Sequence, residues 1–239
     1  MTVSARTGIL GGTFDPIHRG HLAVAVAARR AMNLDEVLLL PLGAPAHRPS
    51  QPEASPAHRL AMVELAAAGS GEPLRVSDLE LSRRGTTFTA ETLRTLHTAG
   101  LAPWQIYFLT GADAFAEIAT WRDYPALLDL AHFVVCARPG YPLAALAARL
   151  PDLAPRLLPA AALRARPVLG RCGPTRIFLL NADTPDVSST TIRARARAGL
   201  PIADLVPPEV DHYIRQHGLY GAPCADSTGG GSAAGTLHE

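Results

Sequence analysis

The sequence predicts an α/β fold in which a doubly wound parallel sheet carries helices on both faces. Short apolar runs alternate with helix-forming segments over most of the 239 residues, and this is the order of strands and helices in such folds. The run at residues 37–40 is apolar without a break, which is typical of a strand buried on both faces of a parallel sheet. A glycine loop lies between the first strand and the first helix, where ligands of this fold class bind.

The expected elements follow in order along the chain. Strands are expected at residues 8–10, 36–40, 74–81, 105–109, 132–137 and 175–180. Helices are expected at residues 21–32, 57–68, 89–98, 124–130, 189–198 and about 207–217. Ser55 is expected to cap the second helix with Pro56 at its first position, and Thr87 or Thr89 to cap the third. The proline-rich segment 141–174 predicts short helices and loops.

Composition limits the partners and the domain count. A formal net charge of +1 gives no global field that would recruit nucleic acid, and no apolar run approaches the length of a membrane span. Three scattered cysteines without a C-x-x-C pair, and a first strand that begins without a signal peptide, favour a reduced cytoplasm. Residues 1–220 are expected to form one domain, and the Gly/Ser/Ala-rich residues 221–239 a disordered tail.

The first loop predicts a phosphate site. It reads Gly11-Gly12-Thr13-Phe14-Asp15-Pro16-Ile17-His18-Arg19-Gly20-His21. A helix start offers unpaired N–H groups and a partial positive charge, and glycines let a phosphate approach the backbone closely. His18 and His21 are three residues apart and can share one face of that helix. The loop matches neither the dinucleotide fingerprint nor the P-loop, and a plain turn with solvated histidines is the simpler alternative.

A second anion site is predicted near the C-terminal end. The motif is Val187-Ser188-Ser189-Thr190-Thr191-Ile192-Arg193. Hydroxyls and free N–H groups at a helix start, with a guanidinium one turn later, suit a phosphate. A well-capped amphipathic helix would also explain this motif taken alone.

These two motifs together resemble the H-x-G-H nucleotidyltransferase superfamily, and within it the bacterial nicotinate-nucleotide adenylyltransferases. The resemblance implies a Rossmann-like nucleotidyltransferase fold and extends over residues 8–220. Four weaker motifs agree with it: Pro45-Ala46-His47-Arg48-Pro49, Gly85-Thr86-Thr87-Phe88-Thr89, Thr110-Gly111-Ala112-Asp113 and Trp121-Arg122-Asp123-Tyr124. Taken alone, such motifs are also explained by a solvated loop, a capped helix or a core aromatic residue. The segment 143–174 departs from the family pattern, so subunit contacts stay open and a homo-oligomer is compatible with the sequence.

The resemblance implies roles for particular residues. Those implied in catalysis are His18, His21, Arg193 and Arg48. Those implied in ATP binding are Gly11, Gly12, Thr13, Phe14, His18, His21, Gly111, Asp113, Ser189, Thr190 and Arg193. Those implied in nicotinate-nucleotide binding are Asp15, His47, Phe88, Thr89 and Trp121.

The implied reaction joins ATP and nicotinate mononucleotide to give nicotinate adenine dinucleotide and pyrophosphate. Mg²⁺ is expected to arrive with ATP, and no pair of carboxylates marks a metal site made by protein alone. The alternatives are an adenylyltransferase for another acceptor, such as nicotinamide mononucleotide, a non-catalytic nucleotide sensor, and a structural domain. A sensor is expected to lose a histidine or the Ser-Ser-Thr motif, and both are intact.

Overall fold

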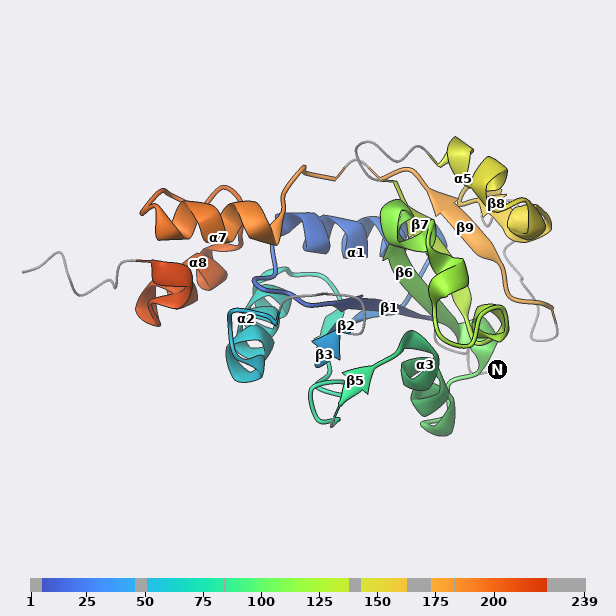
Figure 1. Cartoon of the computed structure of the whole chain (residues 1–239), viewed down its shortest axis with the longest axis horizontal. Helices are drawn as coiled ribbons and strands as arrows, with labels where there is room; N and C mark the ends of the chain where they lie inside the picture. The colour runs from blue at the N-terminus through green and yellow to red at the C-terminus, as the bar shows by residue number, and fades with distance from the viewer. Residues whose placement is uncertain are drawn as a thin grey trace, which may run out of the picture.

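A seven-stranded parallel sheet forms the centre of the molecule (Figure 1). The computed structural model describes residues 6–45, 51–83, 85–137, 143–162, 173–182 and 184–222. The strand order is β4-β2-β1-β6-β7-β9-β8, and every pairing in the sheet is parallel. The strands are β1 (Thr7–Gly12), β2 (Glu36–Pro41), β4 (Leu74–Val76), β6 (Ile106–Gly111), β7 (His132–Cys136), β8 (Leu157–Pro159) and β9 (Ile177–Leu180). The prediction of a doubly wound parallel sheet is therefore confirmed.

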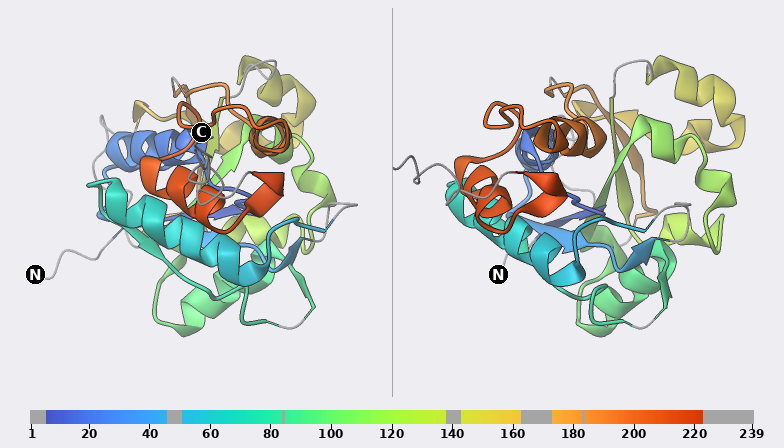
Figure 2. Two further views of the ribbon diagram at one scale, coloured as in Figure 1. Left: turned by 90° about the vertical axis from the view of Figure 1, so that its left-hand side faces the viewer. Right: turned by 60° about the vertical axis from the view of Figure 1, so that its left-hand side comes forward.

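Helices cover both faces of this sheet because successive side chains of each strand point to opposite sides. In β6, Phe108 faces one buried cluster and Leu109 the other. The cluster around Leu109 is covered by α1 (Arg19–Met32), α2 (Pro56–Gly69), α7 (Ser189–Arg197) and α8 (Pro208–Gln216). The cluster around Phe108 is covered by α3 (Thr89–Thr98), α4 (Ala112–Phe115) and α5 (Ala144–Arg149). Figure 2 shows α8 lying against α2 on the first of these faces.

The order of the strands reverses between β1 and β6. From β1 the sheet continues through β2 to β4 on one side, and from β6 through β7 to β9 on the other. The loops that leave the carboxyl ends of these two central strands therefore run apart and leave a crevice, where ligands bind in open α/β sheets. The glycine loop follows β1, and Gly111 ends β6, so both lie at this crevice.

Several local predictions differ from the structure. The expected strand at 74–81 has only three residues, because the chain turns after Val76 and the Ser82 amide donates to the Asp78 carbonyl at 2.9 Å. Segment 141–174 contributes the edge strand β8, which was not expected. The expected helix at 124–130 is a single 3₁₀ turn, η3 (Ala126–Asp129).

Helix starts were predicted with mixed success. Ser55 caps α2 and accepts from the His58 amide at 3.3 Å, as expected. The expected Thr87 or Thr89 cap of α3 is wrong, because Phe88 occupies the cap position and supplies no side-chain cap. A small two-stranded sheet of β3 (Ala44–Pro45) and β5 (Thr86–Thr87) lies just before this helix. The tail from 223 to 239 lies outside the described residues.

Candidate active site

A cleft of about 390 Å³ lies at the carboxyl ends of β1 and β6. Most of the predicted site residues line it: Gly11, Gly12, Thr13, Phe14, Asp15, His21, Phe88, Thr89, Gly111, Asp113, Trp121, Ser189 and Arg193. His18 and Thr190 do not line it. His47 and Arg48 lie outside the described residues. The structure thus brings together segments from the first strand, the middle of the chain and α7.

The glycine loop is shaped by a folded-back aromatic residue. Phe14 is 1% exposed and adopts a positive φ of 49°, which places its ring beneath the loop. A Cβ on Gly12 would lie 2.7 Å from this ring, closer than van der Waals contact allows. Glycine at position 12 is therefore required for the loop to lie flat over Phe14, with its backbone facing the cleft.

The two histidines occupy the start of α1. His18 is the cap residue, and its backbone N–H donates to Nδ1 of His21 at 3.3 Å. Because Nδ1 of His21 accepts, its neutral ring carries the proton on Nε2. The two rings are stacked, with centroids 3.7 Å apart. His21 lines the cleft, and the ring of the buried His18 stacks against it.

Gly20 explains the spacing of this motif. A Cβ at this position would lie 3.0 Å from Nδ1 of His18 and 3.4 Å from the carbonyl oxygen of Pro185. A larger residue would require the His18 ring to shift by a few tenths of an ångström, whereas its contact with Pro185 would be an ordinary one. The glycine between the histidines therefore lets the His18 ring pack closely against the start of α1.

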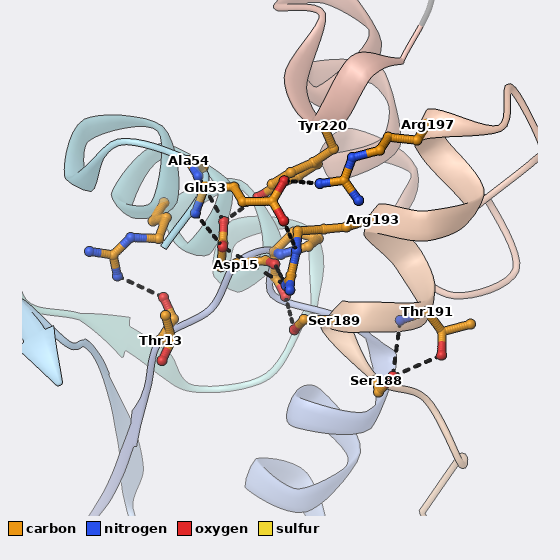
Figure 3. Close-up of polar contacts among 12 residues, drawn as sticks. Thr13, Asp15, Glu53, Ala54, Ser188, Ser189, Thr191, Arg193, Arg197 and Tyr220 are labelled. Atoms are coloured by element: carbon orange, nitrogen blue, oxygen red, sulfur yellow. Dashed lines mark hydrogen bonds and ion pairs between the residues drawn. The ribbon is translucent and has the colours of Figure 1, made fainter. Parts of the chain in front are cut away.

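The start of α7 docks onto the glycine loop (Figure 3). Ser188 caps the helix and accepts from the Thr191 amide at 3.1 Å. The Ser189 hydroxyl donates to the Pro16 carbonyl at 2.9 Å, and Nη1 of Arg193 donates to the Asp15 carbonyl at 2.8 Å. The two motifs, more than 170 residues apart, therefore form one site.

Arg193 is also tied to an acidic side chain. Its Nε donates to Oε1 of Glu53 at 2.8 Å, and Arg197 binds the other oxygen of the same carboxylate. These two guanidinium groups hold the pKa of Glu53 below its usual range, Arg197 contributing most. The guanidinium of Arg193 is thus fixed on two edges before any ligand arrives, while it still lines the cleft.

The far end of the cleft combines aromatic, basic and acidic groups. Phe88 and Thr89 open α3, Trp121 lies at the cleft wall, and the Arg122 guanidinium carbon is 4.5 Å from the centre of the Phe88 ring. Glu80 is 4% exposed, accepts from the Thr92 hydroxyl at 2.6 Å, and has a pKa raised by burial. The guanidinium of Arg122, which also lines the cleft, supplies a positive group that suits an anionic ligand.

Sequence reasoning missed Arg59, Glu53 and Tyr220. Arg59 is 1% exposed and donates from Nη1 to the carbonyls of Thr13 and Leu42 at 2.7 and 2.8 Å. It joins the glycine loop to the end of β2, and burial lowers its pKa. Its partners are backbone atoms, so its own sequence context carried no signal of this role.

The described ranges contain neither a metal-binding cluster nor a membrane-spanning helix. No group of three or more His, Cys, Asp or Glu side chains in them could hold a metal ion. None of their helices combines the length and apolarity needed to cross a membrane.

Comparison with known proteins agrees with this geometry. Residues 9–195 match the family model described as Cytidylyltransferase-like. A Roseiflexus sp. (strain RS-1) protein named "Probable nicotinate-nucleotide adenylyltransferase" is 42% identical over 217 residues, 91% of this chain and 98% of its own length. One of the same name from Moorella thermoacetica is 40% identical over 92% of this chain and 94% of its own.

Solved structures share the fold. The nicotinic acid mononucleotide adenylyltransferase of Plasmodium falciparum, complexed with NaAD, superposes with a TM-score of 0.66. The match covers 91% of this chain and 98% of that one at 19% identity. The family model alone spans most of the sheet and the motifs at residues 11–21 and 187–193. The chain belongs to the Cytidylyltransferase-like family of nucleotidyltransferases.

Proposed function

We propose that this protein transfers the adenylyl group of ATP to nicotinate mononucleotide, a step of NAD biosynthesis that yields nicotinate adenine dinucleotide and pyrophosphate. Relatives 38–42% identical, over 90% or more of this chain, carry the name of this activity. The observation that carries the proposal is the bond from Arg193 to the Asp15 carbonyl, which joins both phosphate motifs at one cleft.

The chemistry needs positioning and charge stabilisation. A phosphate oxygen of the mononucleotide attacks the α-phosphorus of ATP, the bond from that phosphorus to the β-phosphate oxygen breaks, and pyrophosphate leaves. The nucleophile is already an anion, so no general base is required. The chain must hold two anionic substrates close together and stabilise the charge of the transition state.

The donors at the cleft suit this task. Nε2 of His21 would donate to the α/β region of the triphosphate, with His18 holding the ring of its neighbour. Arg193 and the backbone N–H of Ser189 would hold the β and γ phosphates at the start of α7, where the helix dipole favours an anion. Thr190 is exposed and outside the cleft lining, so Ser189 and Arg193 carry the stronger case. Arg48 would stabilise the departing pyrophosphate.

The remaining ATP contacts would come from the two central strands. The backbone of the loop from Gly11 to Phe14 and that of Gly111 would approach the nucleotide, because glycine allows close contact. The Asp113 carboxylate, at the start of α4 and on the cleft lining, would accept from a ribose hydroxyl. This arrangement places the nucleoside between β1 and β6, at the reversal of strand order.

The acceptor would lie at the other end of the cleft. The N–H groups that open α3 at Phe88 and Thr89 suit the pyridine carboxylate, and the Trp121 ring suits the flat heterocycle. His47 and Asp15 would border the mononucleotide. The carboxylate of Asp15 already accepts three hydrogen bonds from the protein, so we infer that it shapes this part of the cleft.

A divalent cation, which we propose to be Mg²⁺, would enter on the phosphates of ATP and offset their charge. The acidic groups at the cleft, Asp15, Glu80 and Asp113, come from separate segments, which fits an ion held mainly by substrate oxygens. We also propose that residues 1–220 act as one catalytic unit in the cytoplasm. Residues 221–239 would take no part in the reaction.

The testing experiment measures pyrophosphate release with ATP and Mg²⁺ for three acceptors: nicotinate mononucleotide, nicotinamide mononucleotide and phosphopantetheine. We expect strong preference for the first, because a site of backbone N–H donors favours a carboxylate over a neutral amide. Preference for another acceptor would overturn the substrate but keep the reaction. Binding of ATP without release for any acceptor would indicate a nucleotide sensor.

A further inference from the structure

Tyr220 lies behind the cleft, where the C-terminal turn meets the glycine loop. This turn, η5 (Leu219–Gly221), follows α8, and the Tyr220 side chain is 7% exposed. Its hydroxyl donates to Oδ1 of Asp15 at 2.8 Å, across 205 residues of sequence. Tyr220 is not among the residues that line the cleft, and its hydroxyl reaches a lining residue through Asp15.

Asp15 is held on its other side by a second segment. Its Oδ2 accepts from the Glu53 amide at 2.8 Å, and its Oδ1 accepts from the Ala54 amide at 3.0 Å. The residue is 5% exposed, and a buried carboxylate requires such donors to remain stable in its place. Tyr220 therefore supplies one of three bonds that fix this carboxylate.

Asp15 also binds Arg193 through its backbone carbonyl. The Asp15 carbonyl accepts from Nη1 of Arg193, and Figure 3 shows Tyr220, Asp15 and Arg193 meeting in this order. A guanidinium has five N–H donors in a rigid plane, so fixing the Nε and Nη1 edges also sets where the other N–H groups point. A shift of Asp15 would move those donors relative to the cleft.

We propose that Tyr220 is a positioning residue for adenylyl transfer, which holds Asp15 so that Arg193 presents its guanidinium to the triphosphate. This inference rests on the role proposed above for Arg193. A purely structural role of Tyr220 is the alternative, in which its hydroxyl stabilises the fold without acting through Arg193. The two roles differ in whether the effects of changing Tyr220 and Arg193 are independent.

A double-mutant cycle on the full chain separates them. Tyr220→Phe keeps the ring and removes the hydroxyl, and we expect kcat/KM for ATP to fall about tenfold with the acceptor saturating. Arg193→Gln should lower kcat/KM for ATP further than Tyr220→Phe does. In the Arg193→Gln background, Tyr220→Phe should change kcat/KM by less than about twofold, because residues that act through one contact are not additive. All variants are assayed well below their unfolding temperatures.

Tyr213→Phe is the matched control. Tyr213 lies on α8, its hydroxyl is 2.9 Å from Nδ1 of His58, and it does not line the cleft. We expect this variant to keep the parent kcat/KM for ATP. An equal fall in the control would overturn the inference, because loss of any hydroxyl near the C-terminal end would then suffice.

Glu53→Gln tests the premise of this inference, that fixing the Arg193 guanidinium matters for the reaction, whether or not Tyr220→Phe folds. It weakens the Nε contact of Arg193 and leaves the buried carboxylate of Asp15 in place. We expect Glu53→Gln to lower kcat/KM for ATP in the parent protein. In the Arg193→Gln background it should change kcat/KM by less than about twofold. Losses that multiply across the cycles, or full activity of Tyr220→Phe, would refute the positioning role. If Arg193→Gln kept full activity while Tyr220→Phe lost activity, the role proposed for Arg193 would be refuted. The same result would show that Tyr220 does not act through Arg193.

Discussion

Arg59→Met tests whether a buried guanidinium holds the glycine loop against the sheet. The Arg59 side chain is 1% exposed, and Nη1 donates to the carbonyls of Thr13 and Leu42 at 2.7 and 2.8 Å. Methionine has an unbranched apolar side chain that can fill much of the space of the arginine stem, but it has no donor. Each carbonyl left without its donor costs about 1–3 kcal/mol, so the gross loss is about 2–6 kcal/mol.

An opposing effect reduces this figure. Burial lowers the pKa of Arg59, which shows that its charge is held at a cost in desolvation, and methionine removes that cost. We therefore expect a net loss of about 3 kcal/mol in the free energy of unfolding, a large share of the 5–15 kcal/mol typical of a folded protein.

Urea unfolding followed by circular dichroism measures this loss. The control is Arg75→Met. The Arg75 side chain is 70% exposed and lies 3.4 Å from Glu36, so this variant should lose less than about 0.5 kcal/mol in the free energy of unfolding. An Arg59→Met protein destabilised by less than about 1 kcal/mol, with an unchanged m-value, would refute the reasoning.

Three further predictions concern the cleft and the sheet. His21→Ala should lower kcat/KM by at least about 100-fold, because a preorganised donor at the reacting phosphate is removed, while the unfolding temperature changes little. Steady-state kinetics and calorimetry measure the two quantities, and activity within tenfold of the parent would contradict the prediction. Arg122→Gln should raise KM for nicotinate mononucleotide by about threefold to tenfold and leave that for nicotinamide mononucleotide unchanged, because its guanidinium stands over Phe88 at the acceptor end. Arg122 also pairs with Glu91 at 3.1 Å, so its control is Arg94→Gln, which breaks a similarly exposed pair with Asp123 away from the cleft. Equal effects of the two substitutions would count against the placement of Arg122 at the acceptor end. Burial lowers the pKa of His132 from 6.5 to about 4, so the unfolded chain takes up a proton between these values while the folded protein does not. Stability should therefore fall by up to about 3 kcal/mol as pH drops from 6.5 to 4, and unfolding of His132→Asn over this range should lack that component.

The parallel sheet and the position of the loops at its carboxyl edge could be predicted because they rest on local patterns. The unbroken apolar run of β2 identified a strand buried on both faces, and the loops at the ends of β1 and β6 then had to meet at one edge of the sheet. The motifs around His21 and Arg193 could be assigned to one cleft on this basis, and the structure brings them together.

The rest depends on contacts between distant segments. β8 has three residues and ends in Pro159, so only its pairing with β9 makes it a strand. Residues 77–81 alternate like a strand, but Glu80 turns inward to bond Thr92 instead. Tyr220 bonds a carboxylate 205 residues away, and no periodicity in either segment signals this.

The long separation of Asp15 and Tyr220 has a consequence for biosynthesis. Asp15 leaves the ribosome early, yet its hydroxyl donor is translated 205 residues later, and the Arg193 anchor 178 residues later. A nascent chain can form β1 and the glycine loop, but the carboxylate there has no complete set of donors until translation reaches the final turn. The hydrogen bonds around Asp15 are therefore completed only after Tyr220 has been translated, and the proposed phosphate site would take its final shape at the end of synthesis.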